Sequence, residues 1–109
     1  MADHEHTFTH WPFTDVVNTA VFLCPHVGRD AFPVLRVCHD HDCEWQFLCG
    51  GDHSNSKPLL VCMGCAVDGD STLMELADLP VGWSAERVEH GAPWHREPLP
   101  LEDGDLVDA

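Results

Sequence analysis

Basic residues are scarce in this chain. Lysine and arginine together number 5 against 19 aspartates and glutamates, so the formal net charge over 109 residues is −14. Nucleic-acid binding depends on clustered lysines and arginines that neutralise phosphates, and this composition argues against it. We therefore expect that a macromolecular partner of this protein is itself basic.

Long apolar runs are also missing. No stretch reaches the roughly 18 consecutive apolar residues that a membrane-spanning helix needs. Residues 1–10, MADHEHTFTH, have neither the basic start nor the apolar segment of a signal peptide. The sequence therefore predicts a cytoplasmic protein without a membrane span, in which thiols stay reduced.

The common catalytic motifs are absent as well. The chain contains no G-x-S-x-G, no H-E-x-x-H, no P-loop and no G-x-G-x-x-G after a strand. With 6 cysteines and 9 histidines, many Cys–His pairs can be drawn, so no single pair indicates a nucleophile. We expect that the protein is not an enzyme.

The composition is that of one folded domain. Hydrophobic residues make up 44% of the chain, which is too many for a disordered acidic segment. We place a single domain at residues 11–96, after a flexible N-terminal segment at 1–10. Residues 97–109 are predicted to form an acidic C-terminal tail, because prolines precede a group of like charges: Glu102, Asp103, Asp105 and Asp108.

Apolar patterns within the domain predict mainly strands. Continuous or alternating apolar runs at 18–24, 33–39, 43–49 and 59–63 favour strands, and the short polar stretch at 40–42 makes a hairpin of the middle two. Trp45 lies on the predicted core face of that hairpin. Thr72 and Glu75 fit a capping box that opens a helix at 72–79, and a last extended segment follows. The fold class is α+β, a mostly antiparallel sheet of about five strands with one helix packed on a face.

The spacing of four cysteines approximates a zinc ribbon. Two pairs, one separated by four residues and one by two, can present four thiolates to a tetrahedral ion: Cys38, Cys43, Cys62 and Cys65. His39 and His41 lie beside the first pair and can replace a cysteine. Two alternatives stay open. The cysteines can be buried core thiols without a cofactor, whereas three disulfides need a secretory context.

The remaining histidines and the acidic turn carry less information. His26 and His53 have no spacing partner that selects a chemistry. Asp40, Asp42 and Glu44 cluster in the predicted hairpin turn, and we treat them as candidate partner-binding residues.

Two segments carry a resemblance to a known family. The sequences HDHDCEWQFL at 39–48 and ELADLPVGWSAER at 75–87 resemble small acidic bacterial proteins of uncharacterised function. Relatives are described as immunity proteins of polymorphic toxin systems. The likeness extends from about residue 11 to residue 96 and implies no catalytic residues, although this chain is richer in cysteine and histidine in the hairpin turn.

The resemblance and the charge together suggest a binding function. Proteins that attack nucleic acid are usually basic, and an inhibitor of charge −14 is steered onto them electrostatically. We therefore expect a non-catalytic, immunity-like protein that neutralises a basic toxin through its acidic turn. The alternative is a small structural zinc-binding module built on the two cysteine pairs, and high charge can also serve solubility alone.

Overall fold

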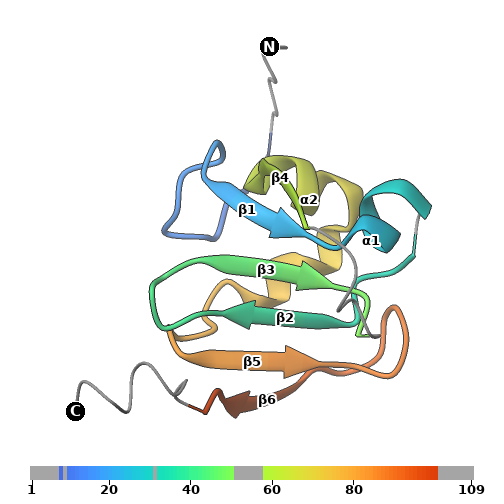
Figure 1. Ribbon diagram of the computed structural model, residues 1–109. Coiled ribbons are helices and arrows are strands. Elements are labelled where there is room, and N and C mark those ends of the chain that lie inside the picture. The colour runs from blue at the N-terminus through green and yellow to red at the C-terminus, as the bar shows by residue number, and fades with distance from the viewer. Residues whose placement is uncertain (1–7, 9, 31, 51–57, 101–109) are drawn as a thin grey trace.

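A six-stranded open sheet forms the framework of the protein. The computed structural model describes residues 8, 10–30, 32–50 and 58–100. The strand order is β4-β1-β3-β2-β5-β6, and every neighbouring pair is antiparallel except β1 and β3, which are parallel (Figure 1). The strands are β1 Ala20–Leu23, β2 Arg36–His39, β3 Trp45–Leu48, β4 Leu59–Cys62, β5 Trp83–Glu86 and β6 His95–Pro98.

The predicted α+β class and the mostly antiparallel sheet are confirmed, with one strand more than expected. The predicted hairpin is β2–β3, in register from Arg36↔Leu48 to His39↔Trp45. Its connection turns at Cys43, whose φ of 75° lies in the left-handed region. The predicted strand at 59–63 is β4, which ends at Cys62.

The helices differ from the single helix predicted at 72–79. Two short α-helices, α1 (Pro25–Asp30) and α2 (Met63–Gly69), precede a 3-10 helix, η1 (Ser71–Leu76). Asp70 rather than Thr72 caps η1, because its carboxylate accepts the Thr72 backbone N–H at 3.1 Å. The apolar run that contains α2 follows a strand without a break, and periodicity cannot separate the two in so short a segment.

The core lies between the sheet and the helices α2 and η1, which lie behind the sheet in Figure 1, whereas α1 lies beyond the end of β1. Trp45 and Phe47 of β3 are almost fully buried, as predicted for Trp45. Met63 and Val67 of α2 and Leu73 of η1 are fully buried in the same cluster. Burial of these side chains is worth roughly 1.5–3 kcal/mol each, and it holds the helices on one face.

The predicted C-terminal boundary falls inside a strand. Glu97 and Pro98, predicted as part of the acidic tail, belong to β6, where Ser84 pairs with Glu97 and Trp83 with Pro98. An edge strand tolerates proline because one side of it has no ladder to complete. In the N-terminal segment, Phe8 packs against Trp11 with ring centroids 4.7 Å apart. The four acidic residues of the tail lie outside the described residues.

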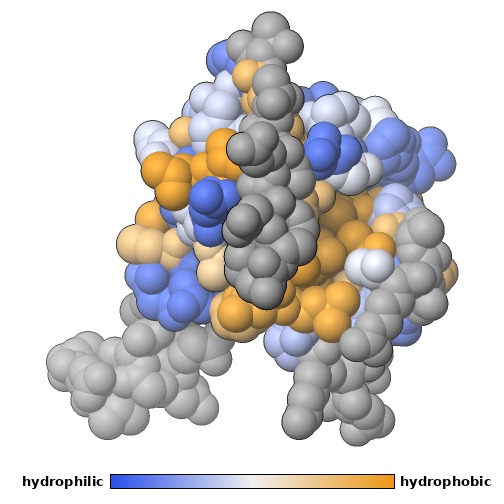
Figure 2. All heavy atoms as spheres, turned by 90° about the horizontal axis from the view of Figure 1, so that it is seen from above, coloured by the Kyte–Doolittle hydropathy of each residue, from blue (hydrophilic) through white to orange (hydrophobic). Residues whose placement is uncertain are grey.

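The β4 edge of the sheet has an apolar surface. Figure 2 views the molecule from above this edge and shows hydrophobic side chains bordered by hydrophilic ones. Leu60 of β4 is 66% exposed. None of the helices in the described part of the chain has the length and apolar character to cross a membrane.

Candidate metal centre

The four cysteines predicted as a zinc site do not come together. Cys38 is buried in β2 and Cys43 is exposed in the hairpin turn, whereas Cys62 ends β4 and Cys65 lies in α2. Two strands, β1 and β3, separate β4 from β2. Three strand spacings amount to about 14 Å, which no single ion can bridge with bonds of about 2.3 Å.

The histidines beside the first pair are also placed elsewhere. His39 is buried, stacks on Trp45 with ring centroids 3.9 Å apart, and its Nδ1 lies 2.8 Å from the carbonyl oxygen of Leu79. His41 is exposed, and its Nε2 lies 3.3 Å from the carbonyl oxygen of Leu99. Both side chains serve the packing of the hairpin on neighbouring segments.

A different group of cysteines and histidine does meet. Cys24 follows β1, His26 is the second residue of α1, and Cys49 follows β3. The sulfurs of the two cysteines and a ring nitrogen of His26 all lie within 4.8 Å of one another. Within the described residues, this is the one cluster of three or more metal-ligating side chains.

The parallel pairing of β1 with β3 creates this cluster. Leu23 pairs with Phe47, so β1 and β3 run in the same direction and end at the same end of the sheet. The residues that follow the two strands, Cys24 and Cys49, therefore lie close together. The backbone N–H of Cys24 donates to the carbonyl oxygen of Phe47 at 2.9 Å, which fixes the exit of β1. Pro25 then opens α1, a position that suits its fixed φ, and the turn brings His26 back over the two sulfurs.

The separations match those of a tetrahedral zinc site. His26 Nδ1 lies 3.7 Å from Cys24 Sγ and 3.6 Å from Cys49 Sγ. With Zn–S bonds near 2.3 Å and Zn–N bonds near 2.05 Å, a tetrahedral angle places sulfur and nitrogen roughly 3.6 Å apart. Both sulfur–nitrogen separations therefore fit a single tetrahedral ion, and the two sulfurs lie within 4.8 Å of each other.

Both sulfurs approach the same ring nitrogen, as two thiolate ligands and an imidazole do around one shared ion. Cys24 is 1% exposed, and a metal ion compensates buried thiolates for their lost hydration. The edge-to-face contact of His26 with Phe32, with centroids 6.0 Å apart, helps to fix the ring plane.

The sequence offers no spacing partner for His26, and its predicted ligands do not include Cys24 or Cys49. Each cysteine directly follows an apolar run, and a position at the end of a predicted strand is the feature of the sequence that could have marked these two residues as candidates. Residues that follow two parallel neighbouring strands lie together at the same end of the sheet, but nothing in the sequence shows that β1 and β3 are neighbours. His53 lies outside the described residues.

The acidic residues of the hairpin turn differ from one another. Asp42 and Glu44 are exposed, whereas Asp40 is half-buried and accepts a hydrogen bond from Gln46 Nε2 at 2.6 Å. Asp42 Oδ1 also accepts the Glu44 backbone N–H at 3.2 Å. The turn thus exposes the carboxylates of Asp42 and Glu44, whereas the Asp40 carboxylate holds the base of the turn through Gln46.

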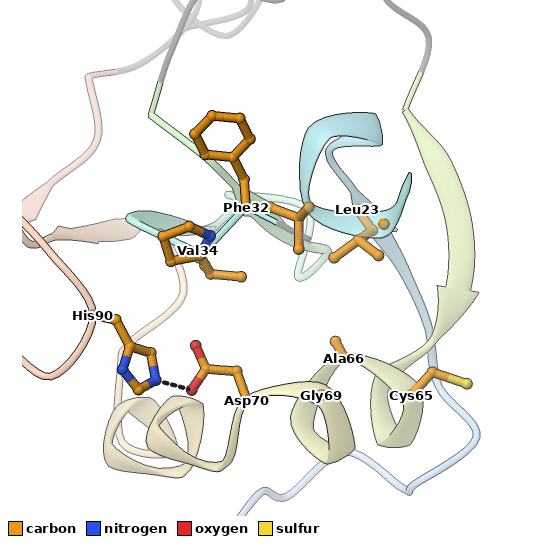
Figure 3. Close-up of a pocket in the computed structure, with 11 residues that line it drawn as sticks. Leu23, Phe32, Val34, Cys65, Ala66, Gly69, Asp70 and His90 are labelled. Atoms are coloured by element: carbon orange, nitrogen blue, oxygen red, sulfur yellow. Dashed lines mark ion pairs between the residues drawn. The ribbon is translucent and has the colours of Figure 1, made fainter. Parts of the chain in front are cut away.

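A cavity of about 630 Å³ lies between α2 and the segment that leads into β2 (Figure 3). Leu23, Phe32 and Val34 form one wall and α2 forms the other. At one end His90 Nε2 lies 3.3 Å from Asp70 Oδ1. The walls are largely apolar.

The carboxylate at the end of this cavity is engaged in structural contacts. Arg87, whose side chain is fully buried, donates from Nη2 to Asp70 Oδ2 at 2.9 Å and from Nη1 to Thr72 Oγ1 at 2.9 Å. Its guanidinium also lies 4.2 Å from the ring centroid of Trp94. Asp70 and Arg87 therefore tie η1 to the segment after β5.

Comparison with protein families, curated proteins and solved structures returns no match for this chain. The resemblance stated from the sequence therefore stays a prediction.

Proposed function

We propose that this protein is a non-catalytic binding domain with a zinc site formed by Cys24, His26 and Cys49. The observation that carries the proposal is the pair of sulfur–nitrogen separations, 3.7 and 3.6 Å, around His26 Nδ1. Two thiolates and an imidazole favour zinc over magnesium or calcium, which prefer oxygen ligands. Zinc takes a fourth ligand in addition to these three.

The ion has a structural role in this proposal. It links the end of β1, the end of β3 and the start of α1. The backbone hydrogen bond from Cys24 N–H to the carbonyl oxygen of Phe47 joins the first two of these segments at the same place. Binding free energy of a structural metal adds to the free energy of folding. The domain that presents the acidic turn is thereby stabilised.

Zinc titration of the purified, reduced protein tests the proposal. We expect one equivalent per chain by native mass spectrometry, with the affinity measured against a competing chelator. Cys49→Ser and His26→Gln each lower the affinity by more than the roughly 10–100-fold that loss of an outer-shell partner costs.

Matched controls come from the same chain. Cys43 and His95 are exposed and lie outside the cluster, so Cys43→Ser and His95→Gln keep the wild-type affinity. Stoichiometric zinc binding that survives both Cys49→Ser and His26→Gln contradicts the proposal, as does a protein that binds no zinc.

We propose as a second function that the acidic surface binds a basic protein, in the manner of an immunity protein. The supporting observations are the net charge of −14 and the exposure of Asp42 and Glu44 in the hairpin turn. Charge complementarity of this kind accelerates association and makes it sensitive to salt.

Co-purification with the product of a neighbouring toxin-like gene tests this second function. The complex forms at low ionic strength, and the double variant D42N/E44Q slows association, with a smaller salt dependence than the wild type. Gln46→Ala, which frees Asp40 without removing a charge, serves as the control. A complex that forms at the same rate with D42N/E44Q argues against the turn as the binding surface.

A further inference from the structure

A second pair of sulfurs lies at another part of the fold. Cys62, the last residue of β4, and Cys65 in the first turn of α2 have their Sγ atoms 3.0 Å apart. The Cys65 backbone N–H also donates to Cys62 Sγ at 3.3 Å. Both side chains are half-buried, so they differ from the fully enclosed thiol of Cys24.

The fold places this pair away from the proposed zinc ligands. Strand β4 runs antiparallel to β1, so Ala20 pairs with Cys62 whereas Leu23, next to Cys24, pairs with Leu59. The two sulfur pairs therefore lie toward opposite ends of β1. In Figure 3 the Cys65 sulfur points away from the centre of the cavity.

The local backbone favours closure of the pair. Cys62 has extended geometry, φ −79° and ψ 151°, and caps α2, so its side chain folds over the first turn of the helix. Residues three apart at a helix start are neighbours, and here their sulfurs already touch at 3.0 Å. A disulfide needs sulfurs about 2.05 Å apart and Cβ atoms roughly 3.5–4.5 Å apart, so closure takes a further small approach of the two side chains.

We propose that Cys62 and Cys65 form a reversible dithiol–disulfide couple that exchanges with low-molecular-weight disulfides. The geometric basis is the contact of two accessible sulfurs on an edge strand and the adjoining helical turn. The proposal is independent of the zinc site, since it uses neither Cys24 nor Cys49.

The reaction proceeds in two exchange steps. The Cys62 thiol loses its proton to solvent and the thiolate attacks one sulfur of the small disulfide; the S–S bond breaks and one small thiolate leaves. The Cys65 thiol then loses its proton and attacks Cys62 Sγ, which releases the second small thiolate. The protein dithiol is oxidised to a disulfide and the small disulfide is reduced to two thiols, so atoms and electrons balance.

The order of the two steps follows from the surroundings of each sulfur. The backbone N–H of Cys65 stabilises negative charge on Cys62 Sγ. Burial, together with the contact to Cys62, raises the pKa of Cys65 to about 11, so Cys65 keeps its proton at neutral pH. Cys62 is therefore the attacking residue and Cys65 the resolving residue.

Equilibration of the full-length protein with reduced and oxidised glutathione, in the presence of a zinc chelator, tests the proposal. After alkylation of free thiols, cleavage before aspartates releases peptide 52–67, in which Cys62 and Cys65 are the two cysteines. We expect this peptide to change from doubly alkylated to unalkylated and lighter by two hydrogens as the oxidised fraction of glutathione rises.

Single variants separate the two roles. Cys65→Ser accumulates a mixed disulfide of glutathione on Cys62 that wild-type protein resolves. Cys62→Ser reacts with oxidised glutathione more slowly than Cys65→Ser does, by about ten-fold, because the remaining thiol is the less ionised one. Cys43→Ser, which removes an exposed thiol elsewhere, leaves the oxidation of peptide 52–67 unchanged.

Two results overturn the proposal. One is a wild-type peptide 52–67 that still carries two alkylated thiols in excess oxidised glutathione. The other is oxidation that joins two chains instead of closing within the peptide. Both measurements use wild-type protein, so they are informative even where a variant does not fold.

Discussion

Cys49 Sγ lies 3.6 Å from His26 Nδ1, although the two residues are 23 positions apart in the chain. The parallel register of β1 and β3 brings them together, because Leu23 and Phe47 are partners and the strands end at one edge. Cys24 Sγ completes the group at 3.7 Å from the same nitrogen.

Zinc is expected to stabilise the fold through this cluster. At free zinc about 1,000 times the Kd, binding to the native state alone adds about 4 kcal/mol and raises Tm by more than about 10 °C. Scanning calorimetry with and without zinc measures the shift. Cys43→Ser retains the shift and Cys49→Ser loses it, whereas an equal shift in both variants contradicts the assignment of the ligands.

The Asp70–Arg87 pair is expected to be important for stability. The Arg87 side chain is fully buried and that of Asp70 is 11% exposed, so Asp70→Asn leaves a buried guanidinium without its counter-charge. Loss of one partner of a buried pair costs about 3–5 kcal/mol. Urea denaturation measures this free energy of unfolding.

A surface pair provides the control for this prediction. Arg36 and Glu86 are 2.6 Å apart, but their side chains are 35% and 47% exposed. Glu86→Gln therefore changes the free energy of unfolding by less than about 1 kcal/mol. Equal losses from Asp70→Asn and Glu86→Gln would show that burial does not decide the strength of these pairs.

Asp70 also makes stability depend on pH. Burial alone raises the pKa of this carboxyl, but the hydrogen bonds from Thr72 and the charges of Arg87 and His90 outweigh it, so the pKa lies below its ordinary value. The unfolded state therefore binds a proton at higher pH than the native state does. The stabilisation is complete above the unfolded pKa, about 3.9, and is lost as pH falls through the lower native pKa.

Acid unfolding followed by tryptophan fluorescence checks the sign of this effect. Between pH 5 and the acid transition, wild-type protein loses more stability than Asp70→Asn, which has no carboxyl to protonate at this position. A variant with the same steep acid dependence as the wild type excludes Asp70 as a contributor.

Local patterns predicted the parts of the fold that form between neighbours in sequence. The β2–β3 hairpin needs two alternating runs and a polar turn, all visible between residues 33 and 49. Strand β4 is visible as a continuous apolar run at 59–63. In contrast, the sequence predicts no helix at α1, because the apolar run at 18–24 ends directly before Pro25; proline often follows a strand, but it also suits the first position of a helix.

The candidate site was not predictable because it depends on long-range pairing. Cys38 and Cys62 have the spacing of zinc ligands, but the sheet order places them three strands apart. Cys24 and Cys49 have no such spacing, yet parallel pairing brings their sulfurs to one histidine. Sequence spacing identifies ligands when they share a local loop, and here the ligands come from separate strands.

X-ray absorption at the zinc edge of the loaded, reduced protein reports the ligands of the ion themselves. We predict a four-coordinate shell with two sulfurs at about 2.3 Å and the remaining nitrogen or oxygen ligands at about 2.0–2.2 Å, including imidazole scattering from His26. Cys49→Ser reduces the sulfur number to one. A shell of four sulfurs, or one of oxygen and nitrogen alone, would contradict a centre built from Cys24, His26 and Cys49.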